Sequence, residues 1–170
     1  EVVQLHEGRD LNIMCGGFVS SGDANAALER ADVTVEGHYR SGFVEHAYIE
    51  PEAGFAQMVN GRVEVHACTQ SPVMDLDSLE IILGIDRSMI RIVPTGVGGG
   101  FGSKLDISVQ PFLALGTMKT GKPVRICYSR TESMQSSTKR HPSDIKLTIG
   151  ATEAGKIMGF NFYGEFDTGA

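Results

Sequence analysis

The sequence lacks tryptophan and has only 3 cysteines in 170 residues. Cys15, Cys68 and Cys127 are widely spaced and form no C-x-x-C pair, which excludes a disulfide framework and a zinc ribbon. Reduced thiols are typical of cytoplasmic proteins, so we expect a cytoplasmic location. No stretch approaches the roughly 18 consecutive apolar residues that a membrane-spanning helix requires, so we expect no membrane partner.

Basic charge is also scarce. The chain has 15 Lys and Arg against 21 Asp and Glu, a formal net charge of −6, and it contains no basic block. This balance excludes nucleic acid as a main partner. Glycine, by contrast, is abundant: its 21 residues exceed the usual share of about 7%, and several gather between residues 96 and 102.

Helix-type and strand-type patterns follow one another without a strict strand–helix–strand rhythm, which predicts an α+β fold of mixed strands and helices. We expect a single domain over residues 1–170, with an irregular arm over 1–21 and a globular part over 22–170. Because the chain starts without methionine and stops just after a strand pattern, we also expect a fragment of a larger polypeptide.

Individual elements follow from periodicity and from turn residues. Asn60-Gly61 between two strand patterns predicts a hairpin, and Glu153-Ala154-Gly155 predicts a second one. Helices are predicted over 23–31, 71–83 and 105–119, with a short helical turn over 131–136. Strands are predicted over 33–39, 43–50, 54–58, 62–67, 90–93, 123–128, 144–149 and 156–163.

The glycine-rich stretch GVGGGFGSK, residues 96–104, lies between a predicted strand and a predicted helix. Three consecutive glycines cost backbone entropy, so local stability does not require them. They permit positive φ angles and bring main-chain N–H groups close to an anion or a metal-bound oxygen. The spacing matches neither a P-loop nor a dinucleotide fingerprint, so a ligand-binding loop and a tight strand-to-helix corner both remain open.

Four motifs in order resemble the molybdenum hydroxylase family of xanthine dehydrogenases and aldehyde oxidases. They are EHAYIEP at 45–51, TQSP at 69–72, GGGFGSK at 98–104 and TGKPVRICYSRTESM at 120–134. The resemblance implies the first part of the molybdopterin-binding region of the large subunit. It also implies a molybdopterin cofactor, with 2Fe-2S clusters and FAD elsewhere in the full enzyme.

The same resemblance implies roles in cofactor binding. Gln70 would reach an oxygen ligand of molybdenum, and the glycine loop would present backbone amides to the cofactor, whereas no side chain would bind the metal directly. The alternatives are a helix cap for Gln70 before Ser71 and a core position for Phe101. The implied loop residues are Gly99, Gly100, Phe101 and Gly102.

Three positions bear on the substrate. The resemblance implies that Phe101 would line the substrate pocket. Leu105 replaces the glutamate with which purine hydroxylases of this family bind the heterocycle. Arg140 in KRHP matches the arginine that orients purines, and a guanidinium suits a carbonyl or carboxylate group. The alternative for Arg140 is a surface ion pair.

The implied reaction is hydroxylation of a C–H carbon of a purine-like heterocycle or an aldehyde with water-derived oxygen. The expected partners are the small-molecule substrate, the rest of the large subunit, and iron–sulfur and flavin domains or subunits in an oligomer. The family's glutamate base has no match here, so the chain alone is expected to be inactive.

Two other functions remain open at this point, and two charged groups are expected to be structural. The first alternative function is a non-catalytic binding module that retains the molybdopterin-binding scaffold, which Leu105 favours. The second is a phosphate- or nucleotide-binding enzyme that uses the glycine loop. Glu45-His46 is expected to be a structural pair, and Asp75, Asp77 and Glu80 are expected to form a solvated helix face.

Overall fold

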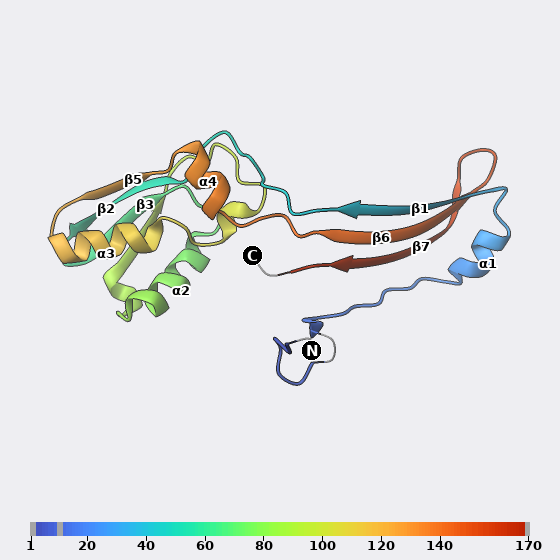
Figure 1. The fold of residues 1–170 in the computed structure, drawn as a ribbon, viewed down its shortest axis with the longest axis horizontal. Helices are drawn as coiled ribbons and strands as arrows, with labels where there is room; N and C mark the ends of the chain where they lie inside the picture. The colour runs from blue at the N-terminus through green and yellow to red at the C-terminus, as the bar shows by residue number, and fades with distance from the viewer. Residues whose placement is uncertain (1–2, 10–11, 169–170) are drawn as a thin grey trace. The chain divides into compact units, whose positions relative to one another are not determined.

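The structure is a computed structural model that describes residues 3–9 and 12–168 (Figure 1). Its contacts group into two compact units. Unit 1 comprises Glu1–Arg40 and Ser143–Glu165, and unit 2 comprises Ser41–Pro142 and Phe166–Ala170. Within the described residues each combines helical structure with a sheet, one α-helix in unit 1 and several in unit 2, which confirms the α+β class. That the two units belong to one domain stays a prediction.

Unit 1 is built on a three-stranded sheet with the order β1-β6-β7. Helix α1 packs where two strand glycines make room, because a Cβ on Gly150 would lie 2.7 Å from the Cβ of Ala31, and one on Gly159 would lie 3.0 Å from Leu28 Cγ. The described part of the predicted arm, residues 3–9 and 12–21, forms no α-helix or β-strand. The elements are α1 (Ala24–Glu29), β1 (Val33–Ser41), β6 (Ser143–Ala151) and β7 (Ile157–Phe166).

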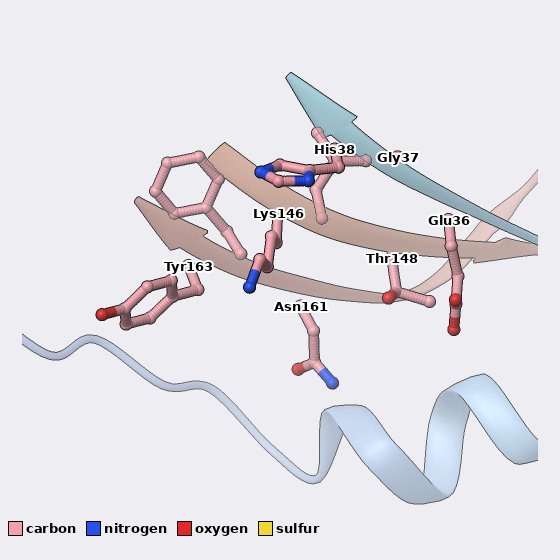
Figure 2. A pocket seen from close by; sticks show the side chains of 9 residues that line it. Glu36, Gly37, His38, Lys146, Thr148, Asn161 and Tyr163 are labelled. Atoms are coloured by element: carbon pink, nitrogen blue, oxygen red, sulfur yellow. The ribbon is translucent and has the colours of Figure 1, made fainter. Parts of the chain in front are cut away.

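An open cavity of about 630 Å³ lies on this sheet. Figure 2 shows Lys146 and Thr148 of β6 and Asn161 and Tyr163 of β7 around it, with His38 on β1. The lining residues belong to unit 1, and none of the residues predicted to bind cofactor or substrate is among them.

Unit 2 contains a four-stranded sheet with the order β4-β3-β2-β5. Strands β2 and β3 pair antiparallel in the register Val59↔Arg62, which confirms the hairpin predicted from Asn60-Gly61. Strands β3 and β4 run parallel, so α2 forms the crossover that joins them. The strands are β2 (Ala53–Val59), β3 (Arg62–Ala67), β4 (Ile90–Pro94) and β5 (Val124–Cys127).

Helices α2 (Pro72–Leu83) and α3 (Gln110–Thr120) pack against this sheet and enclose the core. Helix α2 begins with a proline in its first turn and ends at Gly84, whose φ of 63° is left-handed, as the sequence predicts. The buried Thr117 Oγ1 donates to Ala56 O at 2.9 Å and thereby ties α3 to β2. The core residues are Ala56, Val63, Val65, Ala67, Leu79, Ile90, Val109, Leu113 and Ala114.

The prediction of a helix starting at residue 105 is wrong. Residues Ser103–Leu105 form a short 3-10 helix, η3, and Asp106 is extended. Helix α3 starts at Gln110 because Pro111 favours the first turn of a helix and is disfavoured further inside. A short helix, α4 (Arg130–Ser136), follows β5 and is capped by Ser129 and Glu132, close to the predicted turn.

The strand predicted over 43–50 is also absent. Val44 forms one isolated bridge with Arg140, and Ala47 has a positive φ of 50°, which interrupts an extended conformation. Glu45 accepts hydrogen bonds from Ser137 Oγ at 2.8 Å and from Lys139 Nζ at 2.9 Å, a structural role. Of the helices in the described part of the chain, none is long and apolar enough to cross a membrane.

Candidate functional site

Gln70 and the glycine loop lie in direct contact. Gln70 follows β3, and its Oε1 accepts hydrogen bonds from the main-chain N–H of Gly102 at 3.1 Å and of Lys104 at 3.2 Å. The main-chain N–H of Gln70 donates to Lys104 O at 2.9 Å. The alternative of a helix cap is therefore wrong: the side chain of Gln70 binds the loop, and Ser71 is the residue at the N-cap of α2.

The Nε2 group of Gln70 is the part of this side chain that the loop leaves available. Its Oε1 is taken up by two amides, whereas no residue that the structure describes accepts a hydrogen bond from Nε2. The glutamine is also exposed to solvent. Because Nε2 carries two N–H donors, Gln70 can offer hydrogen bonds to an oxygen atom of a ligand.

The loop contains consecutive main-chain N–H groups that have no hydrogen-bond partner among the described residues. Gly99, Phe101 and Gly102 have positive φ angles of 105°, 53° and 102°. The N–H groups of Gly99, Gly100 and Phe101 have no hydrogen-bond partner within residues 3–9 and 12–168, whereas that of Gly102 donates to Gln70. Successive free amides in such a turn form an anion-binding concavity. Gly102 therefore differs from the expectation, because its amide is already used within the chain.

A charged pair lies at the base of the loop, and the motif analysis missed it. The Lys104 side chain is 3% exposed, and its Nζ donates to Glu50 O at 2.9 Å and to Glu50 Oε2 at 2.8 Å. The same Oε2 accepts the N–H of Gly98 at 2.7 Å. The ammonium also lies 4.5 Å from the ring centroid of Tyr48. Both charged residues stand inside the quoted motifs, which is the signal that could have identified them.

The Glu50 carboxylate is held in its ionised form. Burial alone would raise the pKa of Glu50, but the hydrogen bonds from Lys104 and from the Gly98 N–H outweigh burial and lower this pKa below its ordinary value. A charge-assisted pair with Lys104 is therefore present at neutral pH.

The three predicted substrate residues lie at or beside the loop. Phe101 is 75% exposed and Leu105 is 41% exposed, so the core alternative for Phe101 is wrong. Ser103 Oγ lies 3.1 Å from Thr138 Oγ1, which holds the segment before Arg140 against the loop. Arg140 is exposed, and its guanidinium has no ion-pair partner in the described part of the chain, so the structure gives no support to a surface ion pair.

A buried acid lies in α2, the helix that follows Gln70. Asp75 is 1% exposed, which corrects the expectation of a solvated helix face. Its Oδ2 accepts a hydrogen bond from Gln110 Nε2 at 3.1 Å, which joins α2 to α3. Burial raises the pKa of Asp75, and hydrogen bonds with Thr69 and Gln110 only partly oppose this. The neighbouring Asp77 does lie on the surface, paired with Arg87.

We expect the substitution D75N to stabilise the protein above the acidic range. A raised pKa means that the folded state holds the proton more tightly, so the free energy of unfolding falls as pH rises through the ordinary value of 3.8 towards the folded pKa. Asparagine avoids this loss. Thermal unfolding should show D75N and wild type close together at pH 4, and D75N higher at pH 8, where a gain of about 1 kcal/mol raises Tm by roughly 2–4 °C. Equal destabilisation at both pH values would contradict it.

Comparison with known proteins places the chain in a family. Residues 5–170 match the molybdopterin cofactor-binding domain. The large molybdopterin subunit of nicotinate dehydrogenase from Eubacterium barkeri is 39% identical over 95% of the chain, and a probable xanthine dehydrogenase subunit from Bacillus subtilis is 36% identical over 98%. The solved structure of aldehyde oxidoreductase from Desulfovibrio gigas matches 80% of the chain with a TM-score of 0.67 and 28% identity.

The fold and the family match thus define a cofactor-binding domain. The chain belongs to the molybdopterin cofactor-binding domain of the xanthine dehydrogenase and aldehyde oxidoreductase family, as the resemblance of its motifs predicts. The chain spans 38% of the length of the nicotinate dehydrogenase subunit, 22% of the Bacillus protein and 15% of the aldehyde oxidoreductase chain.

Proposed function

We propose that this chain forms part of a molybdenum hydroxylase that oxidises an aromatic heterocycle carrying a carbonyl or carboxylate group. The observation that carries the proposal is the contact between Gln70 and the glycine loop. In this arrangement the Gln70 Nε2 donor and three consecutive loop amides have no hydrogen-bond partner in the described chain. In this proposal the holoenzyme inserts water-derived oxygen into a C–H bond, with release of two electrons and two protons.

The residues of the loop fit the molybdenum cofactor. The phosphate oxygens of the cofactor would accept hydrogen bonds, and the site offers donors without a partner among the described residues: Gln70 Nε2 and the N–H groups of Gly99, Gly100 and Phe101. The observed position of Gln70 depends on the absence of a Cβ at Gly100, because that atom would lie 2.4 Å from Gln70 Oε1. When bound, the cofactor supplies the two-electron chemistry of hydroxylation.

The residues of this chain contribute binding and orientation. Gln70 donates hydrogen bonds to oxygen acceptors, and its own position is fixed by the amides of Gly102 and Lys104. Phe101 in the loop and Leu105 just after it both expose apolar side chains, which suit an aromatic ring. No residue here is assigned as the general base, so the isolated chain should not oxidise substrates.

The residue types at positions 105 and 140 together indicate the substrate class. An apolar side chain at 105 offers no hydrogen bond to a ring nitrogen, whereas the guanidinium of Arg140, which has no ion-pair partner among the described residues, can bind two oxygens of one carboxylate. The nicotinate dehydrogenase relative, at 39% identity, is named for a pyridine carboxylate, which supports this class over a purine.

We expect R140A in the full-length enzyme to raise KM for its heterocyclic substrate at least about 10-fold, because a charge-assisted hydrogen bond contributes roughly 1.5–3 kcal/mol. The kcat should change less, since the guanidinium binds a part of the substrate that does not react. Steady-state kinetics measure both. The exposed Arg62 at the β2–β3 turn gives the control R62A. Equal KM values for wild type and R140A would exclude this role.

A substrate panel tests the proposed function. The full-length enzyme with its partner subunits is assayed with nicotinate, xanthine, hypoxanthine and benzaldehyde, and an artificial electron acceptor reports turnover. We expect nicotinate or a related carboxylate to give the highest kcat/KM. Oxidation of xanthine alone would contradict the substrate class, and oxidation of none would favour the non-catalytic binding module.

A further inference from the structure

We propose that Glu50 and Lys104 are positioning residues, which clamp both ends of the glycine loop so that its free amides are held in one arrangement for the cofactor. Only the purpose of the clamp, which is to hold the amides for the cofactor, rests on the proposed function. It assigns a role to two charged side chains that lie beneath the loop and that the chemistry described above does not use.

One carboxylate oxygen reaches both ends of the loop. Glu50 Oε2 accepts from Gly98 N–H at 2.7 Å, just before the free amides, and from Lys104 Nζ at 2.8 Å, just after them. The main chain strengthens the first anchor, because Glu50 N–H donates to Gly98 O at 3.2 Å. Lys104 Nζ also donates to Glu50 O at 2.9 Å. Two residues 54 positions apart therefore fix the loop between Gly98 and Lys104.

The clamp joins the Gln70 site through the backbone of Lys104. Its N–H and its O are both bound to Gln70, at 3.2 Å and 2.9 Å. A displacement of the Lys104 side chain therefore moves the anchor of Gln70 as well as the loop. Three glycines have low intrinsic order, so a loop of this composition needs external contacts to hold a single conformation.

The packing around the clamp leaves little freedom. A Cβ on Gly98 would lie 2.6 Å from the Cβ of Glu50, and one on Gly99 would lie 2.8 Å from the Cβ of Tyr48. The Tyr48 ring lies against the Lys104 ammonium at 4.5 Å, which stabilises the buried cation. The loop therefore packs directly against the segment 48–50.

Variants of the full-length protein, produced with its partner subunits, test this role. E50A removes the shared acceptor, K104M removes the ammonium, and E50Q keeps an acceptor oxygen of the same reach. The matched control is E64A, because Glu64 is 7% exposed and pairs with Arg91 at 2.9 Å in the sheet, away from the loop contacts. The readouts are hydrogen–deuterium exchange of peptides covering 98–104, molybdenum per folded protein, and Tm.

We expect E50A and K104M to speed exchange over 98–104 and to lower molybdenum content, each by about 10-fold or more, because small misplacements of a preorganised site have large effects. E50Q should stay within about threefold of wild type in both readouts, since its oxygen still accepts both hydrogen bonds. E64A should lower Tm without changing either readout.

Two results would overturn the proposal. E50A could keep wild-type exchange over 98–104, or E64A could lower molybdenum content as much as E50A does. A wild-type protein without molybdenum would contradict the proposed function instead. In that case the exchange of 98–104 still decides whether Glu50 and Lys104 clamp the loop.

Discussion

The Q70E variant of the full-length enzyme is expected to lose about 100-fold in kcat while it keeps its cofactor, because removal of one preorganised donor costs roughly 10²–10³-fold in comparable sites. Glutamate keeps an oxygen that can accept from Gly102 and Lys104, at the positions where Gln70 Oε1 accepts at 3.1 and 3.2 Å. It replaces the Nε2 donor by a second acceptor. The substitution therefore separates donation to the ligand from support of the loop, which Q70A would remove together.

The control for Q70E is the same exchange at an exposed glutamine. Gln135 in α4 is exposed and takes part in no side-chain hydrogen bond to residues that the structure describes, so Q135E should leave kcat unchanged. Molybdenum content, measured on the same samples, reports cofactor retention. A kcat within about twofold of wild type in Q70E would show that the Nε2 group does not contact the reacting centre.

The G100A variant is expected to lose both activity and molybdenum, each about 10-fold or more. A Cβ at this position would lie 2.4 Å from Gln70 Oε1 and 2.7 Å from its Cδ. Gln70 must move to relieve these contacts, and its exposed side chain is free to do so. The displaced side chain gives up its hydrogen bonds with Gly102 and Lys104, so the loop amides lose their arrangement.

Gly96 provides the matched control, because it precedes the same loop and a Cβ there would meet no atom within 4 Å. G96A should therefore keep activity and molybdenum close to wild type. Kinetics and metal analysis of the two variants, with Tm as a measure of folding, check this prediction. Wild-type activity in G100A would contradict the close approach of Gln70 to the loop.

The sequence predicts those elements that end in residues with strong backbone preferences. Asn60-Gly61 determines the β2–β3 hairpin, and Pro72 and Gly84 mark the limits of α2. The prediction fails over 43–50, where the apolar and charged residues look strand-like. There the chain contacts other loops instead of a strand, through Val44–Arg140 and Glu50–Gly98, and no local pattern specifies these partners.

In the site, too, some features could be predicted from the sequence and others could not. The resemblance of motifs singles out Gln70 and the loop, and the structure places them in contact. The Glu50–Lys104 pair and the burial of Asp75 were not predicted, because each depends on residues distant in sequence. Lys104 lies 54 positions from Glu50, and Gln110 lies 35 positions from Asp75. Spacing rules for charged residues on a single helix cannot detect such pairs.

The molybdenum content of the full-length protein, purified from its native host with its partner subunits, tests the central claim most directly. Mass spectrometry of the metal is compared with protein concentration. We predict close to one molybdenum atom per molybdopterin subunit, together with the released pterin. Metal-free protein from cells that make other active molybdoenzymes would contradict the proposed function and would leave a non-catalytic binding module on the same scaffold.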